Sequence, residues 1–282
     1  MLKRNLRTVI ISILALTVVL SITATSVFMT YAAPSTNDGK RFDNANRVTT
    51  ITGLKQISIV GSTAFIVDAT GHTIATDPNP YGVAIAPPSV PASNKPGTLK
   101  AGDIIVSNIG AADQGNTIVR FPAQQGPGHL FNNVANAGTK GPSAEAFNTT
   151  SGTVWIANST ANNVQIFKPD GTILATITNP LLNHPWGQAY NHGVPNKQDG
   201  AVGAFFSTNE GDGTIDRIDI IPVKGQALPM FKVFQIGQVK KNGAKTKMAV
   251  TWLPSLKIKG AALKDVLLAI DPANSRIAAF PQ

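Results

Sequence analysis

Four Asn or Asp residues recur along the chain at spacings of 50, 51 and 62 residues, and each ends a short apolar run. They are Asn108, Asn158, Asn209 and Asp271. Carboxamide and carboxylate groups gathered on one rim of a fold could bind a polar ligand or an ion. The same residue types also stabilise turns by hydrogen bonding to nearby backbone N–H groups. The turn role explains the recurrence without a ligand, and the two interpretations remain alternatives.

A second group of candidate residues combines histidine with aromatic side chains. His184 and His192 flank a short apolar segment that carries Trp186 and Tyr190. An imidazole near a ligand site could act as a general base, and Trp186 joins the four Asn and Asp residues as a candidate ligand-binding residue. Histidines beside aromatic residues on a strand also serve in packing, with both ring nitrogens satisfied. Packing is the simpler explanation of this cluster.

Familiar catalytic motifs are absent from the sequence. It contains no Gly-x-Ser-x-Gly elbow, no phosphate-binding loop and no His-Glu-x-x-His motif. Residues 209–213 (Asn-Glu-Gly-Asp-Gly) have part of a calcium-loop pattern but lack its later glutamate. A glycine-rich hairpin explains them better. Sequence motifs therefore do not identify a reaction.

The elements that must position these residues form an internal repeat. Each Asn or Asp ends an apolar strand, and a second apolar strand follows a polar turn. The second strand begins near Val164, Ile215 and Ile277, six residues after the recurring residue, and near Ile118, ten residues after it. Every unit also has a preceding strand, at 81–84, 141–144, 185–189 and 248–250. Three units have a following strand, at 129–134, 173–178 and 231–236.

Four short strands in a unit of about fifty residues is the layout of a β-propeller blade. The sequence therefore predicts an all-β propeller with about four recognisable four-stranded blades. In the last unit the sequence stops after the third strand. The ring is therefore expected to be either incomplete, with an open edge that invites self-association, or closed by N-terminal strands. Candidates for such strands lie at 48–51, 57–60, 64–67 and 73–76.

Three segments of the first unit resemble secreted propellers of the NHL-repeat and streptogramin-lyase-like families. They are Asn-Pro-Tyr-Gly-Val-Ala at 79–84, Gly-Asp-Ile-Ile-Val-Ser-Asn at 102–108 and Asn-Thr-Ile-Val-Arg-Phe at 116–121. The resemblance extends over roughly residues 79–282. It implies the propeller fold and leaves function open, because such propellers serve as lyases, lactonases and binding scaffolds.

The resemblance also draws attention to Glu145, which lies on the first strand of the second unit. Lactonase-like propellers hold a divalent metal in the channel with a carboxylate, an asparagine and an aspartate. Glu145, Asn158 and Asp271 supply those types, and such oxygen ligands suit Ca²⁺ or Mg²⁺. A lyase would need a base, for which His184 and Glu145 are the candidates. No local motif ties these residues together, so the expectation of no cofactor stands beside this alternative.

The N-terminus has the order of a secretory signal. Lys3, Arg4 and Arg7 precede an apolar run from Thr8 to Met29, and small residues follow at 30–33. We therefore expect a signal peptide at 1–33, a polar linker at 34–47 and the propeller domain at 48–282. An uncleaved membrane anchor is the alternative. The complete lack of cysteine excludes disulfide staples and favours a bacterial exported protein.

Positive charge is concentrated near the C-terminus. The chain carries a formal net charge of +9, and seven lysines lie between positions 240 and 264 without an acidic residue among them. This patch could draw the protein to an anionic surface through Lys240, Lys241, Lys245 and Lys247. The alternative is a solvated loop insertion. The interleaved glycines, Gly243 and Gly260, argue against nucleic-acid binding.

Taken together, the sequence favours a secreted, non-catalytic scaffold that binds a small molecule or a cell-surface polymer. The alternative is a metal-dependent lactonase- or lyase-like enzyme with a site in the channel.

Overall fold

The computed structural model describes residues 61–68, 71–93, 95, 97–123, 126–131, 138–191, 199–239, 247–258, 261–271 and 276–281. The predicted signal peptide (1–33), the linker (34–47) and the candidate strands at 48–51 and 57–60 lie outside these ranges. So do His192, Lys240, Lys241 and Lys245. In the described part of the chain no helix is long and apolar enough to cross a membrane.

The described residues form β-strands and one short 3-10 helix, η1. The elements are β1 (Phe65–Val67), β2 (Thr73–Ala75), β3 (Pro80–Ile85), β4 (Ile104–Asn108), η1 (Ala111–Asp113), β5 (Thr117–Phe121), β6 (His129–Leu130), β7 (Pro142–Phe147), β8 (Val154–Asn158), β9 (Asn163–Phe167), β10 (Ile173–Thr178), β11 (Pro185–Asn191), β12 (Gly203–Asn209), β13 (Thr214–Ile221), β14 (Met230–Gln238), β15 (Val250–Ile258), β16 (Ala261–Asp271) and β17 (Arg276–Pro281).

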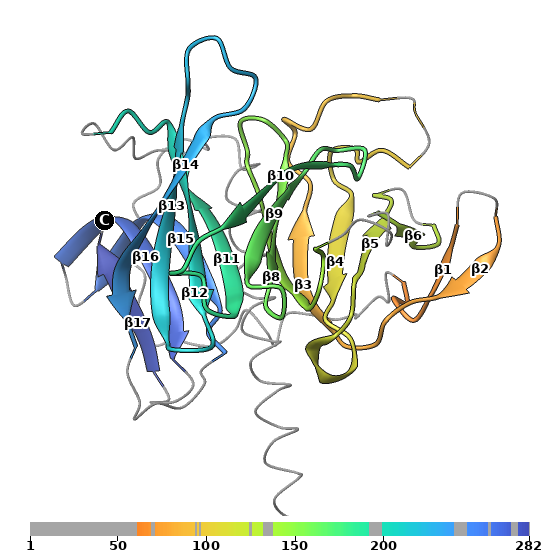
Figure 1. Cartoon of the computed structure of the whole chain (residues 1–282), viewed down its shortest axis with the longest axis horizontal. Coiled ribbons are helices and arrows are strands. Elements are labelled where there is room, and N and C mark those ends of the chain that lie inside the picture. The colour runs from red at the N-terminus through yellow and green to blue at the C-terminus, as the bar shows by residue number, and fades with distance from the viewer. Residues whose placement is uncertain are drawn as a thin grey trace, which may run out of the picture. The chain divides into compact units, whose positions relative to one another are not determined.

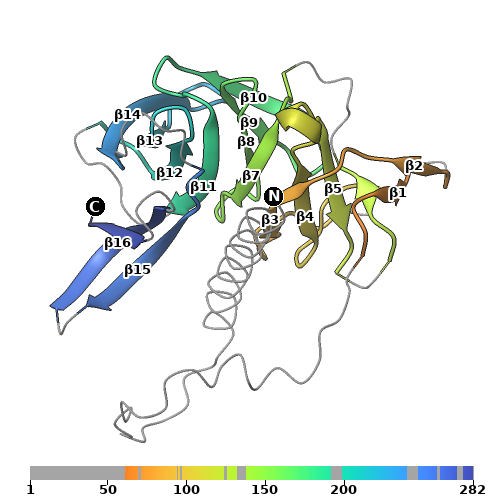
Figure 2. The same cartoon turned by 90° about the horizontal axis from the view of Figure 1, so that it is seen from below.

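Four sheets contain these strands, and each sheet corresponds to one predicted unit (Figure 1). The first has the order β2-β1-β6-β5-β4-β3, the second β10-β9-β8-β7, the third β11-β12-β13-β14 and the fourth β15-β16-β17. Within each unit, consecutive strands pair antiparallel. The first strands of successive units lie next to one another, β3 beside β7, β7 beside β11 and β11 beside β15 (Figure 2). The chain is an all-β propeller whose sheets are the predicted blades.

Apolar side chains from neighbouring sheets fill the space between them. Ile105 and Ile118 of the first sheet pack with Val154 and Ile156 of the second. A separate cluster joins the second and third sheets, where the rings of Trp155 and Phe205 stack with centroids 3.7 Å apart. The third and fourth sheets share a third core cluster. Each inner sheet is therefore covered on both faces, and almost every residue of its second and third strands is buried.

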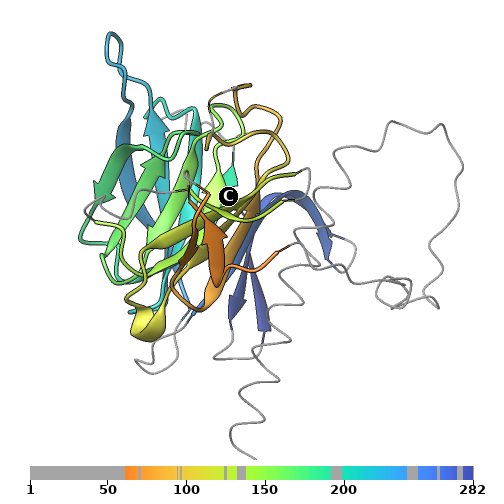
Figure 3. The same ribbon diagram turned by 90° about the vertical axis from the view of Figure 1, so that its right-hand side faces the viewer.

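The described N-terminal strands do not complete the last blade. β1 and β2 form a hairpin whose strand β1 pairs parallel with β6, at Val67 and His129, so the hairpin extends the first sheet (Figure 3). In the described residues β17 pairs with β16 alone. The hypothesis that the strand at 64–67 or the strand at 73–76 closes the ring by completing the fourth unit is therefore wrong. These strands bury Ile66 against Val119 and Phe121 of the first sheet instead.

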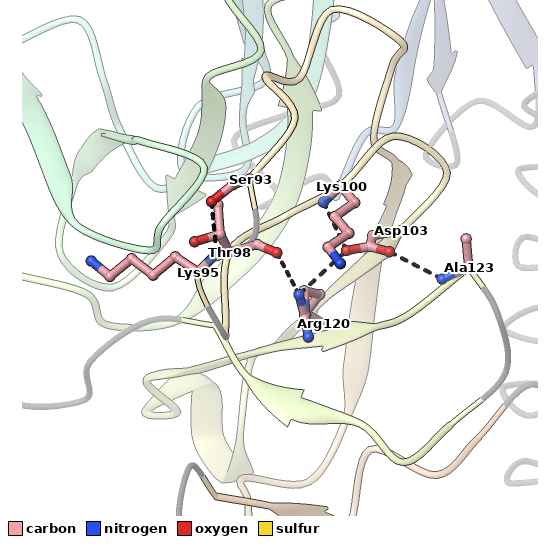
Figure 4. Close-up of polar contacts among 7 residues, drawn as sticks. All are labelled: Ser93, Lys95, Thr98, Lys100, Asp103, Arg120 and Ala123. Carbon is pink, nitrogen blue, oxygen red and sulfur yellow. Dashed lines mark hydrogen bonds and ion pairs between the residues drawn. The ribbon is translucent and has the colours of Figure 1, made fainter.

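A long connection between β3 and β4 is held by a buried ion pair (Figure 4). The Arg120 guanidinium donates to the carbonyl of Thr98 at 2.5 Å and lies 3.5 Å from Asp103 Oδ2. The Asp103 carboxylate also accepts the backbone N–H groups of Lys100 at 2.9 Å and Ala123 at 3.0 Å. These contacts fix the connection to the third strand of its own sheet.

The fourth sheet departs from the predicted strand lengths. The lysine-rich segment that was expected to form loops instead contributes to a long hairpin, with Lys257 on β15 and Lys264 on β16. Leu253 faces Val266 across this hairpin, and the backbone pairing continues to Ile258 with Ala261, which extends the two strands beyond the repeat.

Candidate functional site

The recurring asparagines lie where they were predicted, at the ends of β4, β8 and β12, and they are fully buried. Each Nδ2 donates to the first residue of the following strand. The acceptors are Thr117 Oγ1 at 3.3 Å for Asn108, Asn163 Oδ1 at 2.9 Å for Asn158, and Thr214 Oγ1 at 2.8 Å for Asn209. The amides thus join the second strand of each blade to the third, as the turn hypothesis expects.

The ligand-binding hypothesis for these amides stays a prediction. Asp271 is the last residue of β16, but its side chain lies outside the described residues. Asn108 Oδ1 and Asn158 Oδ1 have no hydrogen-bond partner among the described residues, whereas Asn209 Oδ1 accepts the N–H of Asn183 at 3.1 Å. A ligand at this rim would therefore meet carbonyl oxygens in the first two blades.

In each blade the strand pairing places one residue from every strand of the repeat side by side in a row. The residue of the second strand in this row lies two positions before the recurring Asn or Asp. In the first blade the row is Val83, Val106, Val119 and Leu130, and in the fourth it is Val250, Ala269 and Ala278. In the second blade it is Glu145, Ile156, Gln165 and Thr176, and in the third it is Gln188, Ser207, Asp216 and Gln235. Polar side chains replace apolar ones in this row only in the second and third blades. We call the rows of these two blades the polar rows.

Glu145 begins the polar row of the second blade and points toward the first blade. Its side chain is 6% exposed, and its Oε2 accepts a hydrogen bond of 2.6 Å from Ser107 Oγ on β4. Gly82 on β3 leaves the room for this contact, because a Cβ there would overlap Glu145 Oε2 and Ser107 Oγ. Burial raises the pKa of Glu145 to about 8, against the lowering effect of the Ser107 hydrogen bonds. The carboxyl is therefore mostly protonated at neutral pH.

The polar row of the third blade contains a second perturbed acid. Asp216 is fully buried, and its Oδ2 accepts a hydrogen bond of 2.7 Å from Asn209 Nδ2. Burial is the main cause that raises the pKa of Asp216 to about 7; the Asn209 bond lowers the pKa and the nearby charge of Asp212 raises it. Next to it in the row, Gln188 Nε2 donates to Ser207 Oγ at 2.8 Å.

Three buried oxygens in the polar rows lack a hydrogen-bond partner among the described residues: Glu145 Oε1, Gln188 Oε1 and Asp216 Oδ1. An unmet buried polar atom costs about 1–3 kcal/mol, so three of them in equivalent rows of adjacent blades call for an explanation. Two acids with pKa values near neutrality can also donate or accept a proton at physiological pH. The rows can therefore hydrogen-bond a polar ligand, with Glu145 and Gln188 on the innermost strands.

Among the described residues, the hydrogen bonds of Asn158 and His184 are made with partners other than Glu145. Asn158 directs its amide toward Asn163 and Gln165 within the second blade. The backbone N–H of His184 donates to Asn162 Oδ1 at 2.6 Å, at the junction before β11. Among the described residues no three His, Asp or Glu side chains cluster as metal ligands. Because the Asp271 side chain is not described, the metal hypothesis for Glu145, Asn158 and Asp271 stays a prediction.

Trp186 lies near the start of β11 and is almost fully buried. Its ring meets the ring of Tyr81, at the same level of β3, edge to face with centroids 5.1 Å apart. The strands that carry these rings belong to the first and third blades, so the pair spans the second blade.

A separate pocket of about 450 Å³ is lined by Asn162, Thr178, Asn179, Pro180, Leu182 and Asn183. Neither the polar rows nor Trp186 line this pocket.

Sequence reasoning missed Gln188, Ser207 and Asp216. The signal for Gln188 was present, because it lies three residues after the proline that begins its strand, Pro185, as Glu145 lies three residues after Pro142. Ser207 and Asp216 follow from the strand register, which a single sequence does not fix.

No protein-family model matches the chain, and no curated protein matches it significantly. Solved structures with a similar fold include a catalytically inactive virginiamycin B lyase from Staphylococcus aureus with quinupristin (18% identity, TM-score 0.40, covering 73% of this chain and 57% of that one). A streptogramin B lyase has 13% identity and a TM-score of 0.42, covering 76% of this chain and 59% of that one. An auxiliary nutrient-binding protein from Bacteroides ovatus has 12% identity and a TM-score of 0.39, covering 78% and 45%.

The chain spans less than two thirds of the length of these solved structures. At these TM-scores and identities the likeness carries no argument about activity. The fold is therefore assigned from the sheets of the chain itself, and the function is argued from its own residues.

Proposed function

We propose that this protein is an exported propeller that binds a small polar ligand at the polar rows without transforming it. The supporting observation is the set of unmet buried oxygens in the two inner blades, Glu145 Oε1, Gln188 Oε1 and Asp216 Oδ1. A ligand with hydroxyl or amide groups would satisfy them, because a protonated Glu145 donates a hydrogen bond and Gln188 Oε1 accepts one. Uncharged saccharides and short amides have these groups.

Export and family kinship belong to the same proposal. The positive residues, apolar run and small-residue site within 1–33 support secretion, with membrane anchoring if the signal is not cleaved. The segments at 79–84, 102–108 and 116–121 support kinship with NHL-repeat propellers. A binding role also fits the lack of an assembled catalytic group around Glu145 among the described residues.

An enzyme of the lactonase or lyase kind is the second candidate, because of Glu145. A buried carboxyl with a pKa of about 8 and one unmet oxygen is suited to transfer a proton near neutral pH. In this alternative Ca²⁺ or Mg²⁺ would bind Glu145, Asn158 and Asp271, and His184 would be the candidate partner base.

Calorimetry with a panel of uncharged saccharides and dipeptide amides tests the binding proposal. We expect at least one probe to bind, and Gln188→Ala to weaken that probe at least tenfold. Gln226→Ala, at an exposed position on the third blade, is the matched control and should bind like the parent. If no probe binds, or if both variants bind equally, the polar rows are not the site.

Turnover assays separate the two candidates. γ-Lactones and quinupristin, the compound that accompanies the similar lyase structure, are incubated with the parent protein with and without Ca²⁺ or Mg²⁺. We expect neither to be consumed. Metal-dependent turnover that Glu145→Gln abolishes would replace the binding proposal with the enzyme.

A further inference from the structure

The ammonium group of Lys247 lies in a site made by residues of other blades. Lys247 immediately precedes the last blade, and its Nζ lies 4.0 Å from the ring centroid of Trp186 and 5.5 Å from that of Tyr81. The same Nζ is 3.8 Å from Asp113 Oδ2. A cation within about 6 Å of an aromatic centroid is attracted by the ring. Two rings and one carboxylate therefore share a single positive charge.

The walls of this site are fixed without help from Lys247. The edge-to-face contact of Tyr81 on β3 with Trp186 on β11 does not involve the lysine. The carbonyl of Trp186 accepts a hydrogen bond of 3.1 Å from Ser143 Oγ, and the carbonyl of Asp113 accepts one from Thr160 Oγ1. The ring pair and the backbone that carries the Asp113 carboxylate are thus held by contacts that do not involve the ammonium group.

The occupant is reachable from solvent. The Lys247 side chain is 39% exposed, as is that of Asp113, and Tyr81 is 47% exposed, whereas Trp186 at the base of the site is 5% exposed. An exposed lysine that pairs with one carboxylate gains little stability, and the cation–π contact adds a similarly small amount at a partly exposed site. An external cation can therefore compete with Lys247 for the rings and the carboxylate.

We propose that Tyr81, Asp113 and Trp186 form a binding site for organic ammonium ions, which Lys247 of the same chain occupies until such a ligand displaces it. This site goes beyond the polar rows and does not depend on them. Its ligand class follows from its chemistry: aromatic faces and one carboxylate recognise a quaternary or primary ammonium group, because both attract a positive charge.

The first test removes the internal occupant. Tetramethylammonium chloride is titrated into the parent and into Lys247→Ala, with NaCl holding the ionic strength constant, and binding is followed by calorimetry. We expect Lys247→Ala to bind at least tenfold more tightly than the parent. Lys247→Arg, which keeps a cation in the site, is the matched control and should show no gain. Equal affinity of Lys247→Ala and the parent would overturn the proposal.

A second set of variants identifies the walls. In the Lys247→Ala background, Asp113→Asn and Trp186→Leu should each weaken tetramethylammonium binding at least tenfold. Asp212→Asn, at another loop carboxylate, should not. If the wall variants bind as tightly as Lys247→Ala alone, the ion binds elsewhere and the proposal fails.

A measurement on the parent protein tests the displacement of Lys247 even if Lys247→Ala does not fold. The ring of Trp186 should shift the ε-methylene proton signal of Lys247 upfield in the NMR spectrum. Saturating tetramethylammonium should return this signal toward its ordinary position, whereas NaCl at the same concentration should not. A signal that never moves would show that the ligand does not displace Lys247.

Discussion

Two carboxylic acids in adjacent blades, Glu145 and Asp216, are held largely away from water, and burial is the main cause of the raised pKa of each. In both cases the folded protein binds the proton more tightly than the unfolded chain does. Folding stability therefore falls as the pH rises from the unfolded pKa, 4.5 for Glu145, to the folded pKa of about 8. A buried acid that only filled space would be a liability at neutral pH, which supports a role in binding.

The coupling between proton binding and folding predicts how Glu145→Gln changes the pH dependence of stability. Between pH 7 and 8 Asp216, with a folded pKa of about 7, is already mostly ionised. Glu145 therefore dominates the change in the free energy of unfolding with pH in this range. The parent should lose up to about 1.4 kcal/mol of unfolding free energy per pH unit from Glu145, and Glu145→Gln should lose much less. Urea unfolding at pH 7, 7.5 and 8 measures both slopes.

Asp170→Asn provides the control for this measurement. Hydrogen bonding by Thr172 is the main cause that lowers the pKa of Asp170, so this carboxylate stays ionised throughout the range and the variant should keep the parent slope. Equal slopes for the parent and Glu145→Gln would mean that Glu145 is not a buried protonated acid.

At the level of single residues, sequence reasoning found Glu145 because an acid among small and apolar neighbours stands out. It did not find the close contact of Glu145 with Gly82 and Ser107, which belong to a different blade. Contacts between blades depend on how the sheets pack, and one sequence does not contain that information.

At the scale of strands and connections, the sequence predicted most of the elements, because each blade repeats the same apolar pattern, which a buried asparagine ends in the first three blades. β4, β8 and β12 end at the predicted residues. The full length of the β15–β16 hairpin was missed because its lysines suggested loops, whereas apolar residues such as Leu253 and Val266 face each other across it. Local charge is a weaker guide to strands than facing side chains.

The connection between β3 and β4 offers a prediction about stability. Asp103→Ala should cost about 3–5 kcal/mol, because it leaves the Arg120 charge buried with only the Thr98 carbonyl as a partner. Arg120→Met should cost less, because Asp103 keeps two backbone N–H donors, from Lys100 and Ala123 (Figure 4). Chemical denaturation of both variants measures the difference.

A control on the same connection is Lys95→Ala. Lys95 pairs with Asp170 at 4.0 Å, but its side chain is 72% exposed, so its loss should cost at most about 1 kcal/mol. If Asp103→Ala is as mild as Lys95→Ala, the buried pair does not anchor the connection.

At the scale of the whole molecule, the sheets form a propeller that strand pairing does not close in the described part of the chain. The contacts of Lys247 with Tyr81 and Asp113 join the segment before the last blade to the first blade. Lys247 was predicted as one of four lysines facing an anionic surface. Its ammonium group is instead directed at two rings and a carboxylate, so surface attachment would depend on the other lysines of the patch.

The last prediction separates these roles. If the patch attaches the protein to an anionic surface, replacing Lys240, Lys241 and Lys245 with Gln should weaken adsorption to phosphatidylserine vesicles by about a hundredfold at low salt, since each lysine near such a surface contributes about 1 kcal/mol. Replacing the pair together, Lys247→Gln with Asp113→Asn, leaves the local net charge unchanged and should therefore weaken adsorption little. The control neutralises Lys140, Lys224 and Lys232, which are exposed on other blades, and should leave adsorption near the parent level.

Raising the salt to 1 M, where the Debye length is about 3 Å, should reproduce the effect of the triple variant. Vesicle co-sedimentation measures all of these. Equal adsorption of the two triple variants would show that the patch has no special part in attachment and is a solvated segment.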